Sequence, residues 1–177
     1  MTKLFYNDKQ IIGLDRSNTG IKIMAIDTKR WLVLGYGSID LEPVKVKESL
    51  EGDSSYLADN VKKLLKENII GTLPSNHVAL AVPTAKSYSR TFTLPISVEK
   101  NLKDAVELEV DQYVPIPAST LYIDYQIIER TKKEIVILMS AISRSIVDKC
   151  IAAAEGAGLL VSVVEPGMNS VARLIKS

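Results

Sequence analysis

Hydrophobic and polar residues alternate in short runs over the first forty positions, and Gly, Asp and Asn separate these runs. This pattern is typical of strands joined by tight turns, and it predicts strands over residues 11–15, 20–27 and 31–40. A polar connection is expected over residues 44–52. Asp53 and Ser54 are suitable N-cap residues for the following helix, whose one buried stripe is formed by Leu57, Val61, Leu64 and Leu65.

The rest of the chain alternates between strand and helix periodicity. It predicts strands at 77–82, 88–94, 121–129, 134–142 and 159–165, helices at 97–112 and 145–155, and the start of a helix at 168–175. This mixed pattern predicts an α/β protein with two subdomains. The middle module is expected to pack both of its helices on its own sheet, while strands 77–82 and 159–165 join the N-terminal strands in one sheet. The predicted domains are therefore residues 1–83 plus 159–177, and residues 84–158.

Composition excludes several classes of protein. The 177 residues carry 22 Lys and Arg against 21 Asp and Glu, a balance that provides no basic surface for nucleic acid. No apolar run reaches the roughly 20 residues of a membrane span, and the N-terminus lacks an apolar signal core. We therefore expect a cytoplasmic protein without direct membrane insertion.

Single residues of chemical interest have ordinary structural interpretations. One cysteine, Cys150, and one histidine, His77, cannot form an internal disulfide or a metal cluster, so no catalytic and no metal-binding residue is predicted. Cys150 falls on an apolar helix face and Trp31 falls in a strand, and both are interpreted as packing residues.

Two charged residues fall on otherwise apolar faces. Arg90 shares a strand face with Tyr88, Phe92 and Leu94, and Glu109 lies in the apolar stripe of the following helix. Because an unpaired buried charge is unfavourable by several kcal/mol, the simplest hypothesis is a structural ion pair between Arg90 and Glu109.

The segment GLDRSNTGIK, residues 13–22, places an acidic residue at the end of one strand and small polar residues in the turn to the next. Turn N–H groups can bind phosphate oxygens, Asp15 can hold the water shell of a magnesium ion, and Lys22 adds positive charge. The same residue types also form ordinary hairpin turns for local reasons. Both interpretations stay open at this point.

Several segments together resemble one family. They are the hairpin above, Leu94 with Pro95, ELEVDQYVP at 107–115, IDYQ at 123–126, and Gly158, Leu159 and Val164–Pro166 with Ala172 and Arg173. These stretches are similar to the type IV pilus assembly protein PilM family, a relative of the cell-division protein FtsA in the actin-like ATPase superfamily. The resemblance covers nearly the whole chain. It implies an α/β actin-like fold half, in which subdomain 1A is interrupted by a small 1C lobe.

The resemblance also has implications for a cofactor. It makes Asp15, Ser17, Asn18 and Lys22 a vestigial phosphate loop. Family members usually have glycine at the position of Ser17 and a hydroxyl residue at the position of Asn18, and a side chain at the glycine position crowds a phosphate. ATP with magnesium is implied for a full-length parent that carries a second phosphate loop, and no cofactor is expected for this chain alone.

The function implied by the resemblance is that of a non-catalytic cytoplasmic adaptor at the inner face of the cell membrane. Such an adaptor docks the N-terminal cytoplasmic tail of a PilN-like membrane protein between 1A and 1C. The alternatives are a fragment of an ATP-dependent enzyme, and an FtsA-like filament protein that self-associates. Because two prolines hold the end of the helix rigid, we expect the tail to contact Tyr113, Val114, Pro115 and Ile116, together with the adjoining Tyr122 and Asp124.

Overall fold

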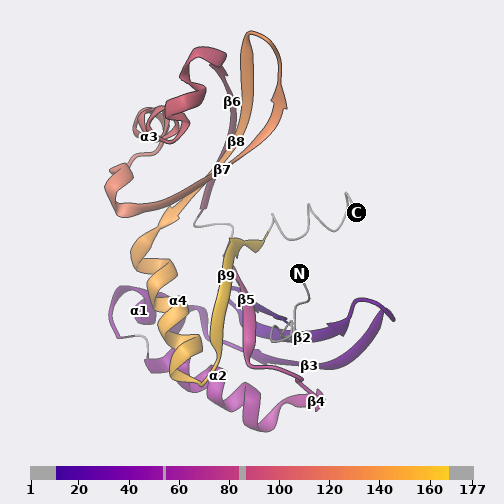
Figure 1. Ribbon diagram of the computed structural model, residues 1–177. Helices are drawn as coiled ribbons and strands as arrows, with labels where there is room; N and C mark the ends of the chain where they lie inside the picture. The colour runs from indigo at the N-terminus through magenta and orange to yellow at the C-terminus, as the bar shows by residue number, and fades with distance from the viewer. Residues whose placement is uncertain (1–10, 54, 84–86, 168–177) are drawn as a thin grey trace. The chain divides into compact units, whose positions relative to one another are not determined.

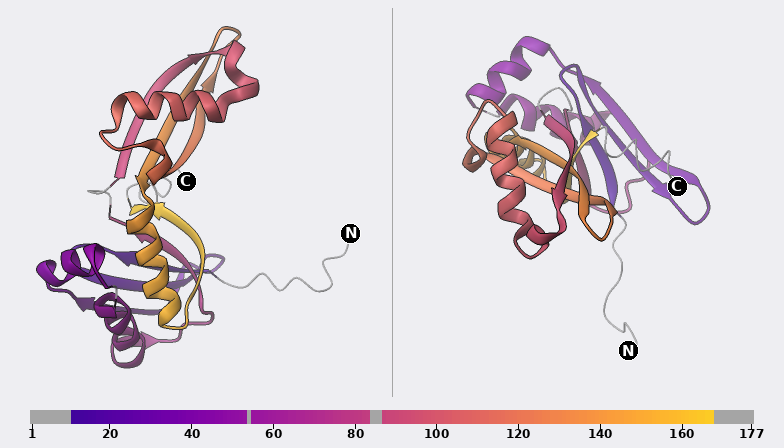
Figure 2. Two further views of the ribbon diagram at one scale, coloured as in Figure 1. Left: turned by 90° about the vertical axis from the view of Figure 1, so that its left-hand side faces the viewer. Right: turned by 90° about the horizontal axis from the view of Figure 1, so that it is seen from above.

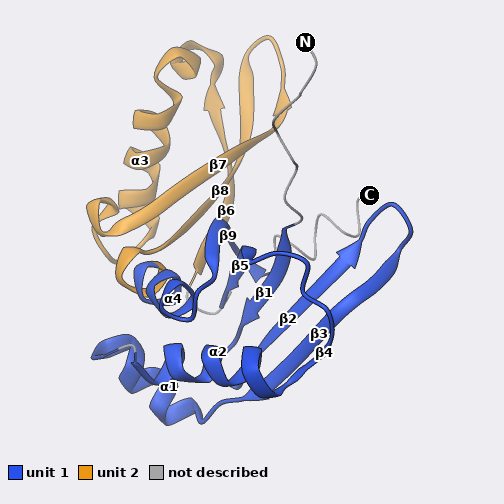
Figure 3. Cartoon of the chain, turned by 60° about the horizontal axis from the view of Figure 1, so that its bottom comes forward, with its two compact units in different colours: residues 1–83, 148–177 blue, residues 84–147 orange. Residues whose placement is uncertain are grey.

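The computed structural model describes residues 11–53, 55–83 and 87–167, which form two compact units (Figures 1 and 3). Unit 1 comprises residues 1–83 and 148–177, and unit 2 comprises residues 84–147. The predicted N-cap residue Ser54 and the helix start expected at 168–175 lie outside the described residues.

Unit 1 is built on a six-stranded sheet with the order β4-β3-β2-β1-β5-β9. Strands β1 to β4 pair antiparallel, and β5 and β9 extend the sheet in parallel. The six strands are β1 (Ile12–Arg16), β2 (Gly20–Asp27), β3 (Leu32–Asp40), β4 (Ile69–Gly71), β5 (His77–Val82) and β9 (Leu160–Pro166). The prediction that residues 77–82 and 159–165 join the N-terminal strands in one sheet is therefore confirmed.

Helices α1 (Pro43–Glu51), α2 (Ser55–Glu67) and α4 (Arg144–Gly156) lie on one side of this sheet (Figure 3). Alternation along β1 buries every second side chain on that side and exposes the intervening ones. The packing is close, because the void between Leu14 and Leu80 of the sheet, Leu57 of α2 and Ala153 of α4 has a volume of only about 10 Å³.

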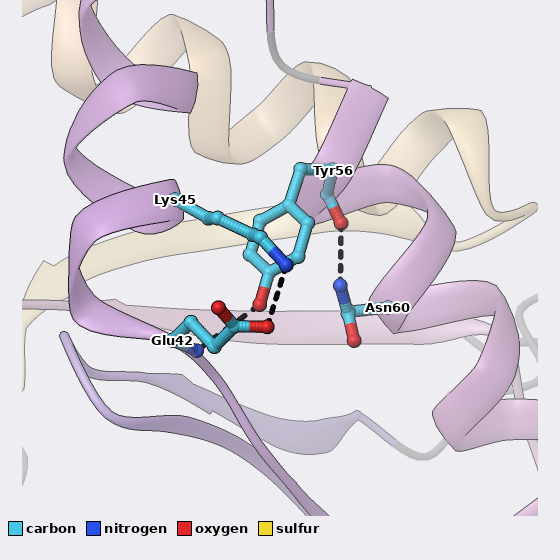
Figure 4. A network of polar contacts seen from close by, with 4 residues as sticks. All are labelled: Glu42, Lys45, Tyr56 and Asn60. Atoms are coloured by element: carbon cyan, nitrogen blue, oxygen red, sulfur yellow. Dashed lines mark hydrogen bonds and ion pairs between the residues drawn. The ribbon is translucent and has the colours of Figure 1, made fainter.

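Helix α1 corrects the expectation of a polar connection over residues 44–52. Pro43 occupies the first turn, where a missing N–H is tolerated, and Val46 and Ser49 are buried. The Tyr56 hydroxyl links the starts of α1 and α2 by accepting the Glu42 backbone N–H at 3.1 Å (Figure 4). Lys45 donates to the Glu42 carboxylate at 2.6 Å, and this hydrogen bond raises the pKa of Lys45. The packing of α1 against its neighbours, and not its composition, makes this short segment helical.

Unit 2 is a three-stranded antiparallel sheet with the order β6-β8-β7, and one helix covers it (Figure 2). It contains β6 (Ser87–Pro95), a 3-10 turn (Ile96–Asn101), α3 (Leu102–Tyr113), a second 3-10 turn (Ala118–Thr120), β7 (Leu121–Arg130) and β8 (Glu134–Ser143). Its core joins α3 to the sheet through Leu102, Val106 and Val110 against Leu121, Ile135, Ile137 and Met139.

The sequence pattern predicted that helix α4 joins α3 on the sheet of unit 2, but α4 does not. From Asp148 onward it belongs to unit 1, so the lobe does not extend to residue 158. Cys150, Ala153 and Ala154 pack against the sheet and α2 of unit 1. In addition, the Lys149 ammonium donates to the carbonyls of Leu50 and Gly52 at 2.6 and 2.9 Å. It thereby satisfies carbonyl groups that the end of α1 leaves without helical partners.

We expect Lys149→Met to lower the free energy of unfolding by about 1–2 kcal/mol, because two charge-assisted hydrogen bonds at a helix C-terminus are lost. Urea denaturation followed by circular dichroism measures this change. Lys62→Met is the matched control, since Lys62 forms only an exposed contact with Asp59 at 3.8 Å. Equal effects of the two substitutions would contradict the role assigned to Lys149.

Candidate functional site

The predicted phosphate loop is the β1–β2 hairpin of unit 1. Asp15 and Lys22 are direct cross-strand partners in the antiparallel ladder, and both side chains are exposed on the sheet face opposite the helices. Ser17 and Asn18 lie in the connecting turn. The structure therefore places all four predicted residues within one hairpin.

Hydrogen bonds within the turn use most of its backbone N–H groups. The Ser17 N–H donates to the Gly20 carbonyl at 2.9 Å. The Ser17 Oγ accepts the N–H of Thr19 at 3.3 Å and that of Gly20 at 3.1 Å. A phosphate bound here must compete with the Ser17 hydroxyl for these donors. This geometry supports the plain-hairpin interpretation over the phosphate-loop interpretation.

The exposed face of the unit 1 sheet is concave beside this hairpin. A cavity of about 560 Å³ is lined mainly by apolar or small residues of five strands, including Gly13, Met24, Tyr36 and Ala79. The lining also includes the charged residues Asp15, Lys22 and Glu165 and the hydroxyl residue Ser38. The cavity is large enough for a small ligand, but it has only these few polar groups to orient one.

The residues predicted to bind a partner tail lie in unit 2 and do not form one surface. Val114 is buried, and Ile116 packs against the core. Tyr113 is 45% exposed at the end of α3, on the side of the sheet that the helix covers. Only Tyr113 and Pro115 of this segment therefore present an exposed side chain.

Tyr122 and Asp124 lie on the opposite face of the sheet. The alternation of β7 directs Ile123 and Tyr125 toward the core and leaves Tyr122 and Asp124 exposed, as predicted. The Arg144 guanidinium stacks on the Tyr122 ring, 4.4 Å from its centroid. Because β6 and β7 are opposite edges of the sheet, the structure separates Tyr122 and Asp124 from the neighbourhood of Tyr113 beside β6.

The predicted ion pair between Arg90 and Glu109 is wrong. Among the described residues no ion pair joins these two side chains, and the Arg90 guanidinium instead lies over the Tyr113 ring, 3.4 Å from its centroid. Arg90 is opposite Met139 in the ladder, so it faces α3 as expected, but it is exposed at the sheet edge. A guanidinium in water needs no carboxylate partner, and it reaches the aromatic ring one helical turn beyond Glu109.

A charged residue that the sequence interpretation missed is Arg16. It is the last residue of β1, on the same buried face as Ile12 and Leu14, and it is only 4% exposed. None of its three guanidinium nitrogens has a hydrogen-bond partner among the described residues. Burial lowers the pKa of Arg16. The alternation of Ile12, Leu14 and Arg16 was the signal that could have identified it.

Cys150 lies beside Arg16. Burial raises the pKa of the Cys150 thiol, and the nearby guanidinium opposes this effect only in part. The interpretation of Cys150 as a packing residue agrees with its burial. Within the described ranges, no group of three or more His, Cys, Asp and Glu residues is arranged to hold a metal ion, and no helix is long and apolar enough to span a membrane.

A family model described as type IV pilus assembly protein PilM matches residues 13–174. The fold resembles that of a solved chain described as a PilM-PilN type IV pilus biogenesis complex. The TM-score is 0.78 at 20% sequence identity, and the match covers 94% of this chain and 52% of that chain.

A second solved structure has the same general fold. It is the cytoplasmic domain of EpsL, an inner membrane component of the type II secretion system of Vibrio cholerae. The TM-score is 0.59 at 8% identity, with 89% of this chain and 57% of that chain covered. The chain thus spans about half the length of the solved chains it matches. These likenesses confirm the predicted fold class, an actin-like fold half.

We expect this chain to show no appreciable affinity for ATP with magnesium, because the Ser17 hydroxyl occupies the turn donors that a phosphate requires. Isothermal titration calorimetry measures this affinity. The double variant Ser17→Gly/Asn18→Ser, which restores the pattern typical of the resembling family, serves as the comparison. Micromolar affinity of the unmodified chain would contradict the prediction and favour the alternative of an ATP-dependent enzyme.

Arg16→Met is expected to raise the free energy of unfolding by roughly 1–3 kcal/mol, since it replaces a buried cation that has no hydrogen-bond partner among the described residues with an apolar side chain of similar length. Thermal and urea denaturation measure the change. Arg30→Met is the control, because the Arg30 side chain is 77% exposed and its replacement leaves stability nearly unchanged. A loss of stability in Arg16→Met would show that the guanidinium has a stabilising partner.

Proposed function

Because the chain belongs to the family of the type IV pilus assembly protein PilM, we propose that it is a non-catalytic adaptor of a pilus assembly machine. It binds the short N-terminal cytoplasmic tail of a PilN-like membrane protein, and through this partner it is held at the inner face of the cell membrane. The observation that carries the proposal is the fold match over 94% of the chain to a protein solved as a PilM-PilN complex.

Unit 2 offers two exposed places where an extended peptide can dock. At the β7 edge, Tyr122 and Asp124 are exposed and the strand pairs with β8 on one side only. An added peptide strand gains backbone hydrogen bonds at such an edge, and side chains such as Tyr122 supply specificity. The second place is the end of α3, where Arg90 holds the ring of Tyr113. Arg144 stacks on Tyr122 at the β7 edge, as Arg90 does on Tyr113 at the end of α3. Each pair orders an aromatic side chain before a partner binds, which lowers the entropy lost on binding.

The β7 edge is the more favourable of the two places. Tyr122 stands on the sheet face that α3 leaves open, whereas Val114 and Ile116 are part of the core beside Tyr113. A substitution such as Ile116→Asp would therefore place a carboxylate against the core and destabilise unit 2, so a loss of binding in that variant could not be assigned to the site. Exposed tyrosines provide cleaner tests.

We expect Tyr122→Ala to weaken binding of the tail at least about tenfold, or roughly 1.4 kcal/mol, and Tyr113→Ala to weaken it much less. The reverse order of effects would assign the peptide to the end of α3. The probe is a synthetic peptide with the sequence of the N-terminal tail of the PilN-like protein from the same organism. Calorimetry measures its affinity, and circular dichroism confirms that each variant is folded.

Tyr36→Ala is the matched control, since Tyr36 is an exposed tyrosine of unit 1 with 46% exposure, close to the 41% of Tyr122. A loss in Tyr36→Ala alone would move the site to the open sheet face of unit 1. The absence of any binding of the peptide to the unmodified chain would contradict the proposed function itself.

A further inference from the structure

The β2–β3 hairpin carries an exposed apolar tip that neither the core of unit 1 nor the proposed docking sites use. Trp31 is 75% exposed, and Leu32 and Val33 are each 54% exposed. The expectation that Trp31 packs within a strand is therefore wrong. Figure 1 shows the hairpin extending beyond the other strands of the unit 1 sheet. Three consecutive exposed apolar residues at one hairpin tip indicate an interaction surface.

The backbone of the tip is held in one conformation. Asp27 and Leu32 are paired across the hairpin, so residues 28–31 form a four-residue loop. The Asp27 Oδ1 accepts the backbone N–H of Lys29 at 2.9 Å and that of Arg30 at 3.1 Å. The Asp27 carboxylate is thus largely engaged within the loop, and the side chains of the loop project from an ordered frame.

The backbone conformation of Trp31 is unfavourable for a bulky side chain. Its φ of 53° is in the left-handed region, which Gly and Asn adopt easily and a bulky side chain does not. Among the described residues the indole has no hydrogen-bond or ring partner that offsets this strain. A tryptophan at a strained and solvent-exposed position contributes little to folding, and this points to a role in binding.

We propose that this tip contacts the surface of an anionic phospholipid bilayer. The indole of Trp31 and the side chain of Leu32 enter the headgroup region, where tryptophan is favoured because it is apolar with one polar N–H. Lys29 and Arg30 precede them in the same loop, and the Arg30 side chain is 77% exposed with only a 4.0 Å contact to Asp27. Their charges complement anionic headgroups.

A lipid surface fits this tip better than a protein surface does. Protein hot spots lie near the centre of closely packed interfaces, where water is excluded around them. Here the apolar residues lie at the end of a narrow two-stranded hairpin with cations beside them, which is the arrangement of a shallow interfacial anchor. The contact goes beyond the proposed adaptor role and does not depend on it. Where the lipid contact and tail docking both form, the weak lipid contact strengthens docking, because it raises the effective concentration of the chain beside its membrane partner.

The fluorescence of the unmodified protein tests the proposal directly, because Trp31 is the one tryptophan of the sequence. Vesicles of phosphatidylglycerol and phosphatidylethanolamine, at millimolar lipid, are expected to shift its emission to the blue and to protect it from iodide quenching. Brominated lipids are expected to quench it. Unchanged emission with anionic vesicles would overturn the proposal, and an equal shift with phosphatidylcholine vesicles would overturn the role of the two cations.

Charge variants provide the matched comparison. Lys29→Glu/Arg30→Glu is expected to lower the partition coefficient for anionic vesicles at least about tenfold, whereas Lys132→Glu/Lys133→Glu, at the β7–β8 turn, changes it less than about twofold. Equal losses in the two variants would indicate a general charge effect and would overturn the assignment to this tip.

Trp31→Gly separates binding from folding. Glycine suits the left-handed backbone, so the melting temperature is expected to stay unchanged or rise, while co-sedimentation with anionic vesicles is lost. Co-sedimentation at the level of the unmodified protein would overturn the proposal. A blue shift of Trp31 caused by the PilN-like tail peptide in the absence of vesicles would also overturn it, and would assign the tip to a protein partner.

Discussion

The parallel pairing of β5 with β9 is the constraint on which the rest of the structure depends. The two strands are neighbours in the unit 1 sheet, although the whole of unit 2 lies between them in the chain. A parallel pair needs a long crossover connection, and here unit 2 and α4 together make that connection. Helix α4 must then return along the sheet to deliver β9. This requirement explains why α4 packs on unit 1 and why Lys149 binds the end of α1.

Arg16 and Arg90 show how the same side chain has different consequences in the two units. Both follow an alternating pattern that directs them to the helix-covered face of a sheet. Arg16 comes under α2 and α4, where water is excluded and its guanidinium nitrogens have no partner among the described residues. Arg90 lies at an exposed edge and stacks on Tyr113. The position of the covering helix, and not the strand pattern, decides whether a charge of this kind destabilises the fold.

The two units present different kinds of surface. In the β1–β2 hairpin, the Ser17 hydroxyl accepts the backbone N–H groups of Thr19 and Gly20, so the turn is held by its own hydrogen bonds. In unit 2, arginines stack on the exposed rings of Tyr113 and Tyr122, and in unit 1 the tip of the β2–β3 hairpin exposes Trp31 to solvent. The exposed side chains of both units are therefore presented on hairpins, edges and helix ends, where a rigid sheet holds them in place.

The sequence by itself determined every strand of the two sheets except the short edge strand β4, the continuous sheet, the exposure of Tyr122 and Asp124, and the family, because alternation and local motifs are properties of neighbouring residues. It did not determine helix α1, the partner of Arg90, the separation of Tyr113 from Tyr122, or the exposure of Trp31. Each of these depends on which distant segment covers a given face or edge. Only the tertiary structure decided that, because burial is set by contacts between segments far apart in the chain, while periodicity shows only that a face exists.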